Sequence, residues 1–433
     1  MMHSVRSDGR RFFQFLLVVL SAGAIYPLVY LRSAYQEPIL EVFQISLSDL
    51  NTIYMVLGFV FIAGYFPSGF LADRFSEKKL LVLSLIMTGI GGVWFALVPK
   101  VGDASFNFIG VVVAFVIWGV FSVFTFWGAH LKLVKLLAKK EEQGRFFGIL
   151  DGGRGVIEAG LATVAAFIFT YIGSSTLALT KEALQYVIYM YAGVLFFVAF
   201  LVILFVDADQ TDKEVADVTA LLETPQKKFH FSDLLALFKN GPLLTLGIII
   251  FMGYTVTWAY YYLGGFLGTN IGVSPETVAT VMVISMWMRP VGGVFGGYLA
   301  DRFGKANIVM SASLLSAISL SALALIPTST RVIVFYVIVV LASLFIYTIR
   351  GTYWSLLGDC RVDNRNAGVS IGVVSLIGYL PDVLVPIVNT AFISSFGEST
   401  GYNAYFLWSA GMGLIAVILL MFFKEMTRQA VSQ

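Results

Sequence analysis

Long apolar runs recur along the whole chain and are separated by short polar segments. A helix needs about 20 apolar residues to cross a bilayer, whereas transmembrane β-strands are about half that length and alternate in polarity. The runs are long and do not alternate, so the pattern predicts an all-α membrane protein. We expect twelve transmembrane helices, over residues 11–34, 48–71, 79–98, 108–137, 144–171, 183–206, 241–267, 275–299, 306–326, 331–357, 366–390 and 402–423.

Basic residues are divided unevenly between the two sides of these predicted spans. If the N-terminus is cytoplasmic, most of the 28 lysines and arginines fall on that side or in the tails. Only Lys100, Lys181 and Arg331 fall in loops on the other side. Cytoplasmic loops of membrane proteins carry the excess of Lys and Arg, so we expect both termini in the cytoplasm. The net charge of +2 gives no reason to invoke nucleic acid.

A loop motif is repeated in the two halves of the chain. GFLADRFSEKK at 69–79 follows the second span, and GYLADRFGKAN at 297–307 follows the eighth. The longest polar segment, 207–240, separates six spans from six. We therefore expect a six-helix bundle over 1–206, a cytoplasmic loop with a short amphipathic helix over 207–240, and a second bundle over 241–433.

Two further matches keep the same register. Alignment of the fifth span with the eleventh places Glu158 opposite Asp382, and alignment of the fourth with the tenth places Gly128 opposite Gly351. Together the matches indicate internal duplication, which is a common plan for transporters with a site between the halves.

The paired G-x-L-A-D-R-F loops resemble the signature of the major facilitator superfamily, and the resemblance covers the whole chain. It implies two pseudo-symmetric six-helix halves and transport by alternating access. In that family the acidic and basic loop residues bridge neighbouring helix ends and stabilise the outward-facing state. The role carries over to Asp73, Arg74, Lys78, Lys79, Asp301, Arg302 and Lys305, and Ser76 departs from the usual glycine. We expect Gly69 and Gly297 to permit close helix packing. For Lys78 and Lys79, a solvated charge that only sets topology is the alternative.

Charged residues also lie inside the predicted spans. An ionisable side chain at mid-bilayer costs at least about 2.5–3.5 kcal/mol and indicates a functional site by default. In GILDGGRGVIEAG (148–160), Asp151, Arg154 and Glu158 fall on one helix face. At 1.5 Å per residue, Arg154 lies near the midplane. We expect Arg154 to bind substrate and the carboxylates to carry protons; the alternative is a self-neutralised structural stripe, with the glycines at 152, 153 and 155 admitting another helix.

Two further arginines are candidate substrate ligands. Arg289 lies near the middle of the eighth span and is similar to an arginine in nitrate-type members of the family. Arg32 lies in YPLVYLRSAYQEPIL, which resembles the first span of the organophosphate–phosphate antiporter branch, where an arginine binds the phosphate group. The alternative for Arg32 is snorkelling to the headgroups. Trp258 and Tyr261 are candidate cavity aromatics, although packing is the alternative role.

Asp382 is the remaining carboxylate inside a span. It follows Pro381, has no cation nearby on its own helix and is the repeat counterpart of Glu158, which suits a proton carrier. Alternatively, Arg289 or Arg32 of another helix neutralises it.

The arginines in the spans slightly outnumber the carboxylates and favour an anionic substrate. The sequence thus predicts a proton-coupled secondary transporter of a small organic anion, either a carboxylate or a phosphorylated metabolite. A drug exporter and a non-transporting metabolite sensor are the alternatives. Nothing indicates an enzyme: we find no nucleophile–base pair, phosphate-binding loop or metal-ligand spacing. We expect no metal or cofactor, a monomer, and a bacterial inner membrane.

Overall fold

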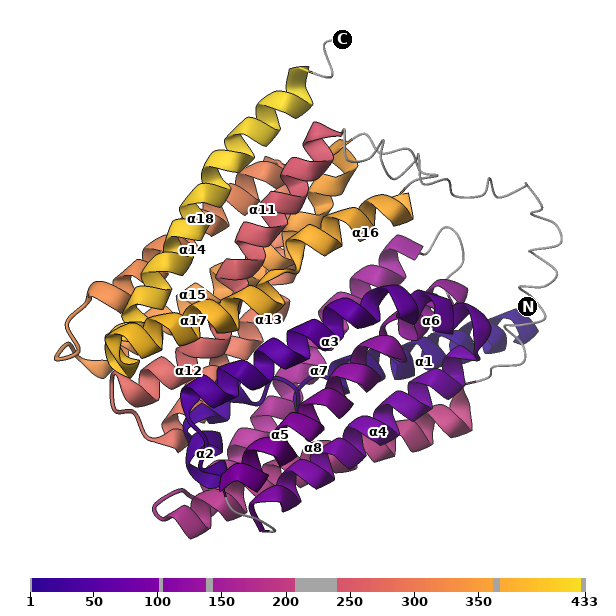
Figure 1. The fold of residues 1–433 in the computed structure, drawn as a ribbon. Helices are drawn as coiled ribbons and strands as arrows, with labels where there is room; N and C mark the ends of the chain where they lie inside the picture. The colour runs from indigo at the N-terminus through magenta and orange to yellow at the C-terminus, as the bar shows by residue number, and fades with distance from the viewer. Residues whose placement is uncertain (1, 101–103, 138–142, 207–239, 361–366, 430–433) are drawn as a thin grey trace. The chain divides into compact units, whose positions relative to one another are not determined.

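The computed structural model describes residues 2–100, 104–137, 143–206, 240–360 and 367–429. The elements of the first half are α1 (Met2–Ala24), α2 (Arg32–Phe43), α3 (Leu47–Arg74), α4 (Glu77–Leu97), η1 (Val98–Lys100), α5 (Ala104–Gly119), the π-helical turn η2 (Val120–Phe124), α6 (Trp127–Leu137), α7 (Gln143–Ile172) and α8 (Leu177–Phe205). Those of the second half are α11 (Gly241–Trp258), α12 (Tyr260–Thr269), α13 (Pro275–Phe303), α14 (Lys305–Leu325), α15 (Val332–Thr352), the 3-10 helix η4 (Tyr353–Cys360), α16 (Ala367–Gly378), α17 (Pro381–Phe396) and α18 (Glu398–Gln429). The described part of the chain is helical throughout, as predicted (Figure 1).

Within the described residues, eleven helical segments are long and apolar enough to cross a membrane, and they overlap the second to twelfth predicted spans. The first predicted span is divided. Its helix α1 begins among charged residues and ends at Ala24, and a turn over residues 25–31 separates it from α2. Neither piece alone combines the required length with the required hydropathy, which is why this span differs from the other eleven.

Breaks of the same kind interrupt other spans. The turn at 120–126 separates α5 from α6, Ala259 separates α11 from α12, and Tyr379–Leu380 separates α16 from α17. The last break has a clear cause: Pro381 cannot donate a backbone hydrogen bond and is favoured in the first turn of a new helix. Asp382 therefore lies in the first turn of α17.

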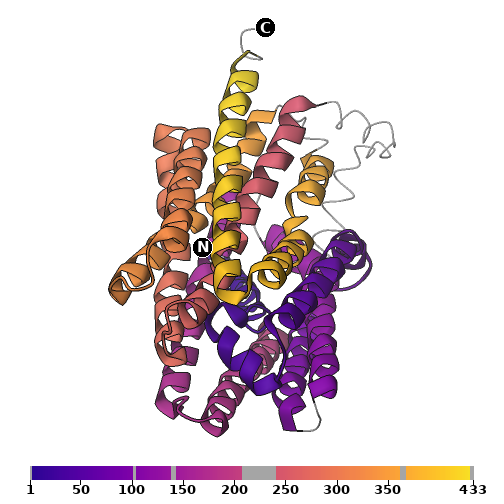
Figure 2. The ribbon, with the colours of Figure 1, turned by 60° about the vertical axis from the view of Figure 1, so that its left-hand side comes forward.

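The helices group into two compact units. Unit 1 comprises Met1–Leu31, Pro38–Ser46 and Val56–Lys227, and unit 2 comprises Arg32–Glu37, Leu47–Met55 and Lys228–Gln433. Within unit 2, the long C-terminal helix α18 packs against α11, α14 and α17, and it is the yellow helix in Figure 2. The predicted amphipathic helix of the central loop falls outside the described residues.

Glycine allows close helix packing, but not at the positions we expected. A Cβ placed on Gly128 of α6 would lie 2.5 Å from the carbonyl oxygen of Ser68 on α3, and one on Gly351 of α15 would lie 2.9 Å from Gly293 Cα on α13. These two glycines are the repeat-matched pair. By contrast, a Cβ on Gly69 or Gly297 would meet no atom within 4 Å. The prediction that these two loop glycines permit close packing is therefore wrong for the described residues.

Candidate transport site

Arg154 and Glu158 form a largely buried ion pair on α7. Arg154 Nη2 lies 3.8 Å from Glu158 Oε1, and the two side chains are 11% and 9% exposed. The residues are four apart and so lie on one face of the helix. Asp151, one turn earlier, is exposed and forms no ion pair or hydrogen bond with Arg154 in the described structure. The predicted three-charge stripe is thus one pair with a separate carboxylate.

Helix α1 packs closely on α7 beside this pair. A Cβ on Gly153 would lie 2.5 Å from Val19 Cγ1, and one on Gly23 would lie 2.6 Å from Ile157 Cβ. Gly153 therefore admits another helix, as its alternative role predicted, whereas a Cβ on Gly152 would meet nothing within 4 Å. This close approach carries the segment after α1 towards Arg154.

Tyr26, in the turn after α1, provides the second contact of Arg154. The guanidinium carbon lies 5.0 Å from the centre of the Tyr26 ring, which is cation–π distance. The Tyr26 hydroxyl donates to the carbonyl oxygen of Ser122 at 3.2 Å, and this bond fixes the ring. Arg154 Nε is buried and has no hydrogen-bond partner among the described residues. The guanidinium thus keeps donor capacity that its neighbours do not use.

Asp382 is buried in unit 2, where neutral donors hold it. Its Oδ1 accepts hydrogen bonds from the Tyr254 hydroxyl at 2.7 Å and from Trp258 Nε1 at 3.0 Å, and only 2% of the residue is exposed. Neither Arg289 nor Arg32 forms an ion pair or a hydrogen bond with this carboxyl in the described structure, so the alternative that one of them neutralises Asp382 is wrong there. The repeat-equivalent Glu158 and Asp382 are both buried, but Glu158 forms an ion pair with Arg154, whereas Asp382 accepts hydrogen bonds from a phenol and an indole.

Aromatic side chains surround Asp382. The Trp258 ring packs edge-on against Tyr54 and Tyr261, with centroids 6.2 Å and 5.2 Å apart. On the other side, Tyr254 packs edge-on against Tyr379 at 4.9 Å. Trp258 and Tyr261 are both buried. Trp258 is therefore a hydrogen-bond donor to the carboxyl as well as a packing residue, while the role of Tyr261 in binding remains a prediction.

Arg32, at the start of α2, is fully buried within unit 2. Its Nη1 donates to Asn51 Oδ1 at 3.0 Å and its Nη2 to Gln36 Oε1 at 2.8 Å. The guanidinium also lies 4.8 Å and 4.2 Å from the ring centres of Tyr54 and Tyr262. A side chain enclosed in this way does not reach the headgroups, so the snorkelling alternative is wrong for this structure.

The Arg32 network extends to the second half of the chain. Asn51 Nδ2 donates to Asn389 Oδ1 at 2.8 Å, and Gln36 Nε2 donates to the Tyr402 hydroxyl. The Tyr262 hydroxyl donates to Asn51 Oδ1 at 3.2 Å. Amide oxygens and ring faces, rather than carboxylates, thus surround this cation. A ligand role for Arg32 stays a prediction, as does one for Arg289, which is partly buried on α13.

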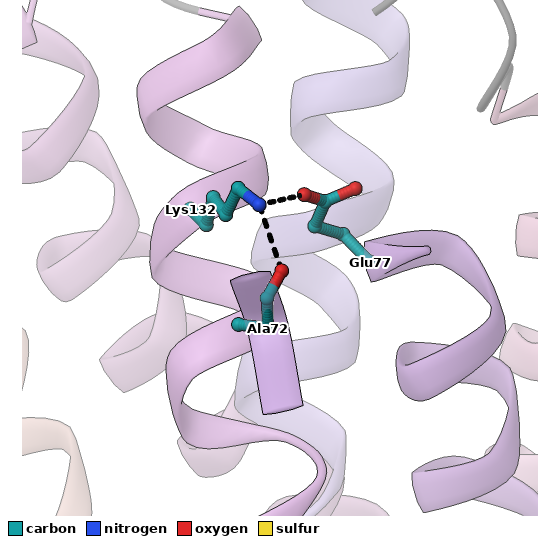
Figure 3. Close-up of polar contacts among 3 residues, drawn as sticks. All are labelled: Ala72, Glu77 and Lys132. Carbon is teal, nitrogen blue, oxygen red and sulfur yellow. Dashed lines mark hydrogen bonds and ion pairs between the residues drawn. The ribbon is translucent and has the colours of Figure 1, made fainter. Parts of the chain in front are cut away.

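Lys132 of helix α6 contacts the first of the two repeated loops, residues 69–79, which is called the first signature loop below. Its Nζ donates to the carbonyl oxygen of Ala72 at 2.7 Å and lies 2.8 Å from Glu77 Oε1 (Figure 3). Ala72 lies in the last turn of α3, where a cation is favoured, and Glu77 begins α4, where an anion is favoured. One ammonium on α6 therefore joins the end of α3 to the start of α4. Neither Lys132 nor Glu77 was among the predicted loop residues.

The predicted loop residues have different environments. Lys78 Nζ donates to the carbonyl oxygen of Ile203 in the last turn of α8 at 2.8 Å, so it bridges a neighbouring helix end as the family resemblance implied. Arg74, Asp301 and Arg302 are exposed. The side chain of Asp73 lies outside the described part of the structure. The gating role of this loop set stays a prediction.

Comparison with known proteins identifies the family. The sequence pattern of the Major Facilitator Superfamily matches residues 12–386. Inner membrane protein YqcE of Escherichia coli (strain K12) is 25% identical over 427 residues, which cover 96% of this chain and 95% of the relative. Inner membrane protein YihN of the same strain is 25% identical over 372 residues, covering 85% and 84%.

Solved transporter structures share the fold. A D-xylose–proton symporter superposes with a TM-score of 0.73 at 16% identity, covering 95% of this chain and 97% of that one. The nucleoside transporter NupG gives 0.67 at 15% identity, covering 96% and 98%. At these identities the likeness concerns the fold alone. The chain is a multi-pass membrane protein that belongs to the Major Facilitator Superfamily, a family of transporters and not of enzymes.

Proposed function

We propose that this transporter moves a small organic anion, bound by Arg154, together with protons. The observation that carries the proposal is the incomplete coordination of the Arg154 guanidinium. A guanidinium has five N–H donors and stays charged. Here its carboxylate partner is 3.8 Å away, its ring contact uses no N–H, and its buried Nε has no described acceptor.

An anionic ligand can accept the hydrogen bonds that the Arg154 guanidinium does not donate to its described neighbours. Carboxylate and phosphate oxygens match the guanidinium fork and can accept two parallel hydrogen bonds. A buried N–H donor without an acceptor is unfavourable. A hydrogen bond from such a donor to a ligand therefore contributes more to the free energy of binding than the same bond would in water. Arg154 supports a carboxylate or phosphorylated metabolite better than a neutral or cationic substrate.

Glu158 offers a physical route to proton coupling. An anion that binds Arg154 competes with Glu158 for the guanidinium. A buried carboxylate that loses its cation is strongly unfavourable unless it takes up a proton. Anion binding and proton uptake are then linked at one site, which favours movement of both in the same direction. Asp382, whose described donors are neutral, is the second candidate carrier.

The test uses the purified protein and a defined panel. The panel contains succinate, L-malate, L-lactate, propionate, glycerol 3-phosphate and propyl phosphate, the neutral amides lactamide and succinamide, and the amphiphilic cation tetraphenylphosphonium. Thermal stabilisation identifies ligands, and uptake of each ligand is then measured in liposomes under an imposed pH gradient. We expect stabilisation and gradient-driven accumulation for at least one anion. Stabilisation by the cation alone would indicate an exporter, and anion binding without uptake would indicate a sensor; either overturns the proposal.

A further inference from the structure

His130 is a buried histidine that the sequence did not single out. It lies on α6 and has no exposed surface. Its ring stacks on Phe126 with centroids 4.7 Å apart and packs edge-on against Trp127 at 5.3 Å. No group of three or more metal-ligating side chains occurs among the described residues, so a metal does not explain it.

The two ring nitrogens of His130 have different environments. Nδ1 lies 3.1 Å from the carbonyl oxygen of Phe126, and because a carbonyl only accepts, Nδ1 carries the hydrogen. Nε2 is buried and has no hydrogen-bond partner in the described structure. In the neutral ring this nitrogen is an acceptor. Buried side-chain groups without a partner are rare in folded proteins and call for an explanation.

The contacts of His130 connect it to Arg154 within unit 1. Phe126, which stacks on the imidazole, also packs edge-on against Tyr26 at 6.5 Å. Tyr26 in turn presents its ring to the Arg154 guanidinium at 5.0 Å. An unused acceptor therefore belongs to the same cluster as the unused donors of Arg154.

We infer that His130 Nε2 accepts a hydrogen bond from a hydroxyl or N–H group of the substrate whose anionic group Arg154 holds. The inference rests on the proposed function and narrows its substrate class to small anions that carry a donor near the anionic group, such as hydroxy acids. His130 is then a specificity residue: it favours a hydroxylated anion over the analogue that lacks the hydroxyl.

Two substitutions separate the ring nitrogens. The amide nitrogen of Asn occupies about the place of Nδ1, so His130→Asn keeps a donor for the Phe126 carbonyl and removes the Nε2 acceptor. The longer Gln amide reaches the place of Nε2, so His130→Gln keeps an acceptor there. Dissociation constants are measured by calorimetry for matched ligands: L-lactate with propionate, L-malate with succinate, and glycerol 3-phosphate with propyl phosphate.

We expect the unsubstituted protein to bind the hydroxylated member of its preferred pair about tenfold more tightly. His130→Asn should bring this ratio to about one without weakening the analogue, and His130→Gln should keep part of it. A ratio near one in the unsubstituted protein, or the same ratio in His130→Asn, overturns the inference and leaves the proposed function standing if Arg154→Gln still abolishes anion binding. Absence of binding by every anion to the unsubstituted protein would instead overturn the proposed function.

Discussion

Arg154 and Glu158 lie one helical turn apart on α7 with 3.8 Å between Nη2 and Oε1. That distance permits electrostatic attraction but exceeds the usual 2.7–3.2 Å of a hydrogen bond. The two groups are therefore close enough for the carboxylate to neutralise the largely buried cation, and far enough apart for a ligand to bind the guanidinium. This relationship is the basis of the proposed coupling between anion binding and proton uptake.

Replacement of Glu158 by Gln should strengthen anion binding and abolish coupling. The amide no longer competes as an anion for Arg154, so we expect the best ligand of the panel to bind about fivefold more tightly, or ~1 kcal/mol. The variant should still transport the ligand until its concentrations inside and outside the liposomes are equal, but a pH gradient should no longer drive accumulation. Calorimetry and liposome uptake measure the two effects.

Asp151→Asn is the matched control on the same helix. Asp151 is exposed and forms no ion pair or hydrogen bond with Arg154 in the described structure. We therefore expect nearly unchanged affinity and accumulation. If Asp151→Asn uncoupled transport and Glu158→Gln did not, the assignment of the two carboxylates would be reversed.

Asp382 is the second carboxyl whose loss should affect coupling. We expect Asp382→Asn to keep ligand exchange while reducing accumulation under a pH gradient. Tyr254→Phe removes one of the two donors to Oδ1 and leaves the carboxyl, so it should shift the pH dependence of uptake without abolishing accumulation. Uptake measured across a range of pH values separates these effects; full accumulation by Asp382→Asn would exclude Asp382 as a carrier.

Lys132 should stabilise the first signature loop. Lys132→Met leaves the buried Glu77 carboxylate and the Ala72 carbonyl without their shared donor. We expect a loss of about 1–3 kcal/mol in stability, reduced somewhat because Lys132 is partly exposed. Lys79→Met, at an exposed lysine of the same loop, is the control and should change the melting temperature little. Equal melting temperatures for the two variants would contradict this role.

Two glycines of the first half offer a direct packing test. A methyl group on Gly128 would meet the carbonyl oxygen of Ser68 at 2.5 Å, whereas one on Gly69 would meet nothing within 4 Å. We expect Gly128→Ala to lower stability by about 1–3 kcal/mol, as overpacking does, and Gly69→Ala to have little effect. Thermal unfolding in detergent compares the variants, and the opposite order would restore the sequence-based expectation for Gly69.

Much of the fold follows from the apolar pattern, because helix length and hydropathy are local properties. The eleven unbroken or singly kinked spans matched their predicted ranges. The division of the first span was not predicted, because the turn at 25–31 lies inside an apolar run and its one sequence signal is a helix breaker, Pro27, and not a polar residue. Both repeat-matched pairs of glycines behave alike: Gly128 and Gly351 each lie close to another helix, whereas Gly69 and Gly297 do not, so only the expectation of close packing at Gly69 and Gly297 failed.

The site was predictable where a charge lies inside a span. Glu158 and Asp382 are buried and Arg154 is largely buried, as their positions suggested. Their partners were not predictable, because Tyr26, Tyr254 and Trp258 reach them from other helices. No motif in the sequence marks His130 as a candidate site residue. A single histidine suggests a binding role only when the structure shows that one of its ring nitrogens has no hydrogen-bond partner.

The most direct test of the central claim measures charge discrimination at Arg154. Dissociation constants for a carboxylate ligand and its neutral amide, such as L-lactate with lactamide, are compared in the unsubstituted protein and in Arg154→Gln. We predict that the unsubstituted protein prefers the carboxylate by about 10–100-fold, as expected for hydrogen bonds to a charged group, and that Arg154→Gln loses this preference while remaining folded. Retention of the full preference in Arg154→Gln would contradict the account.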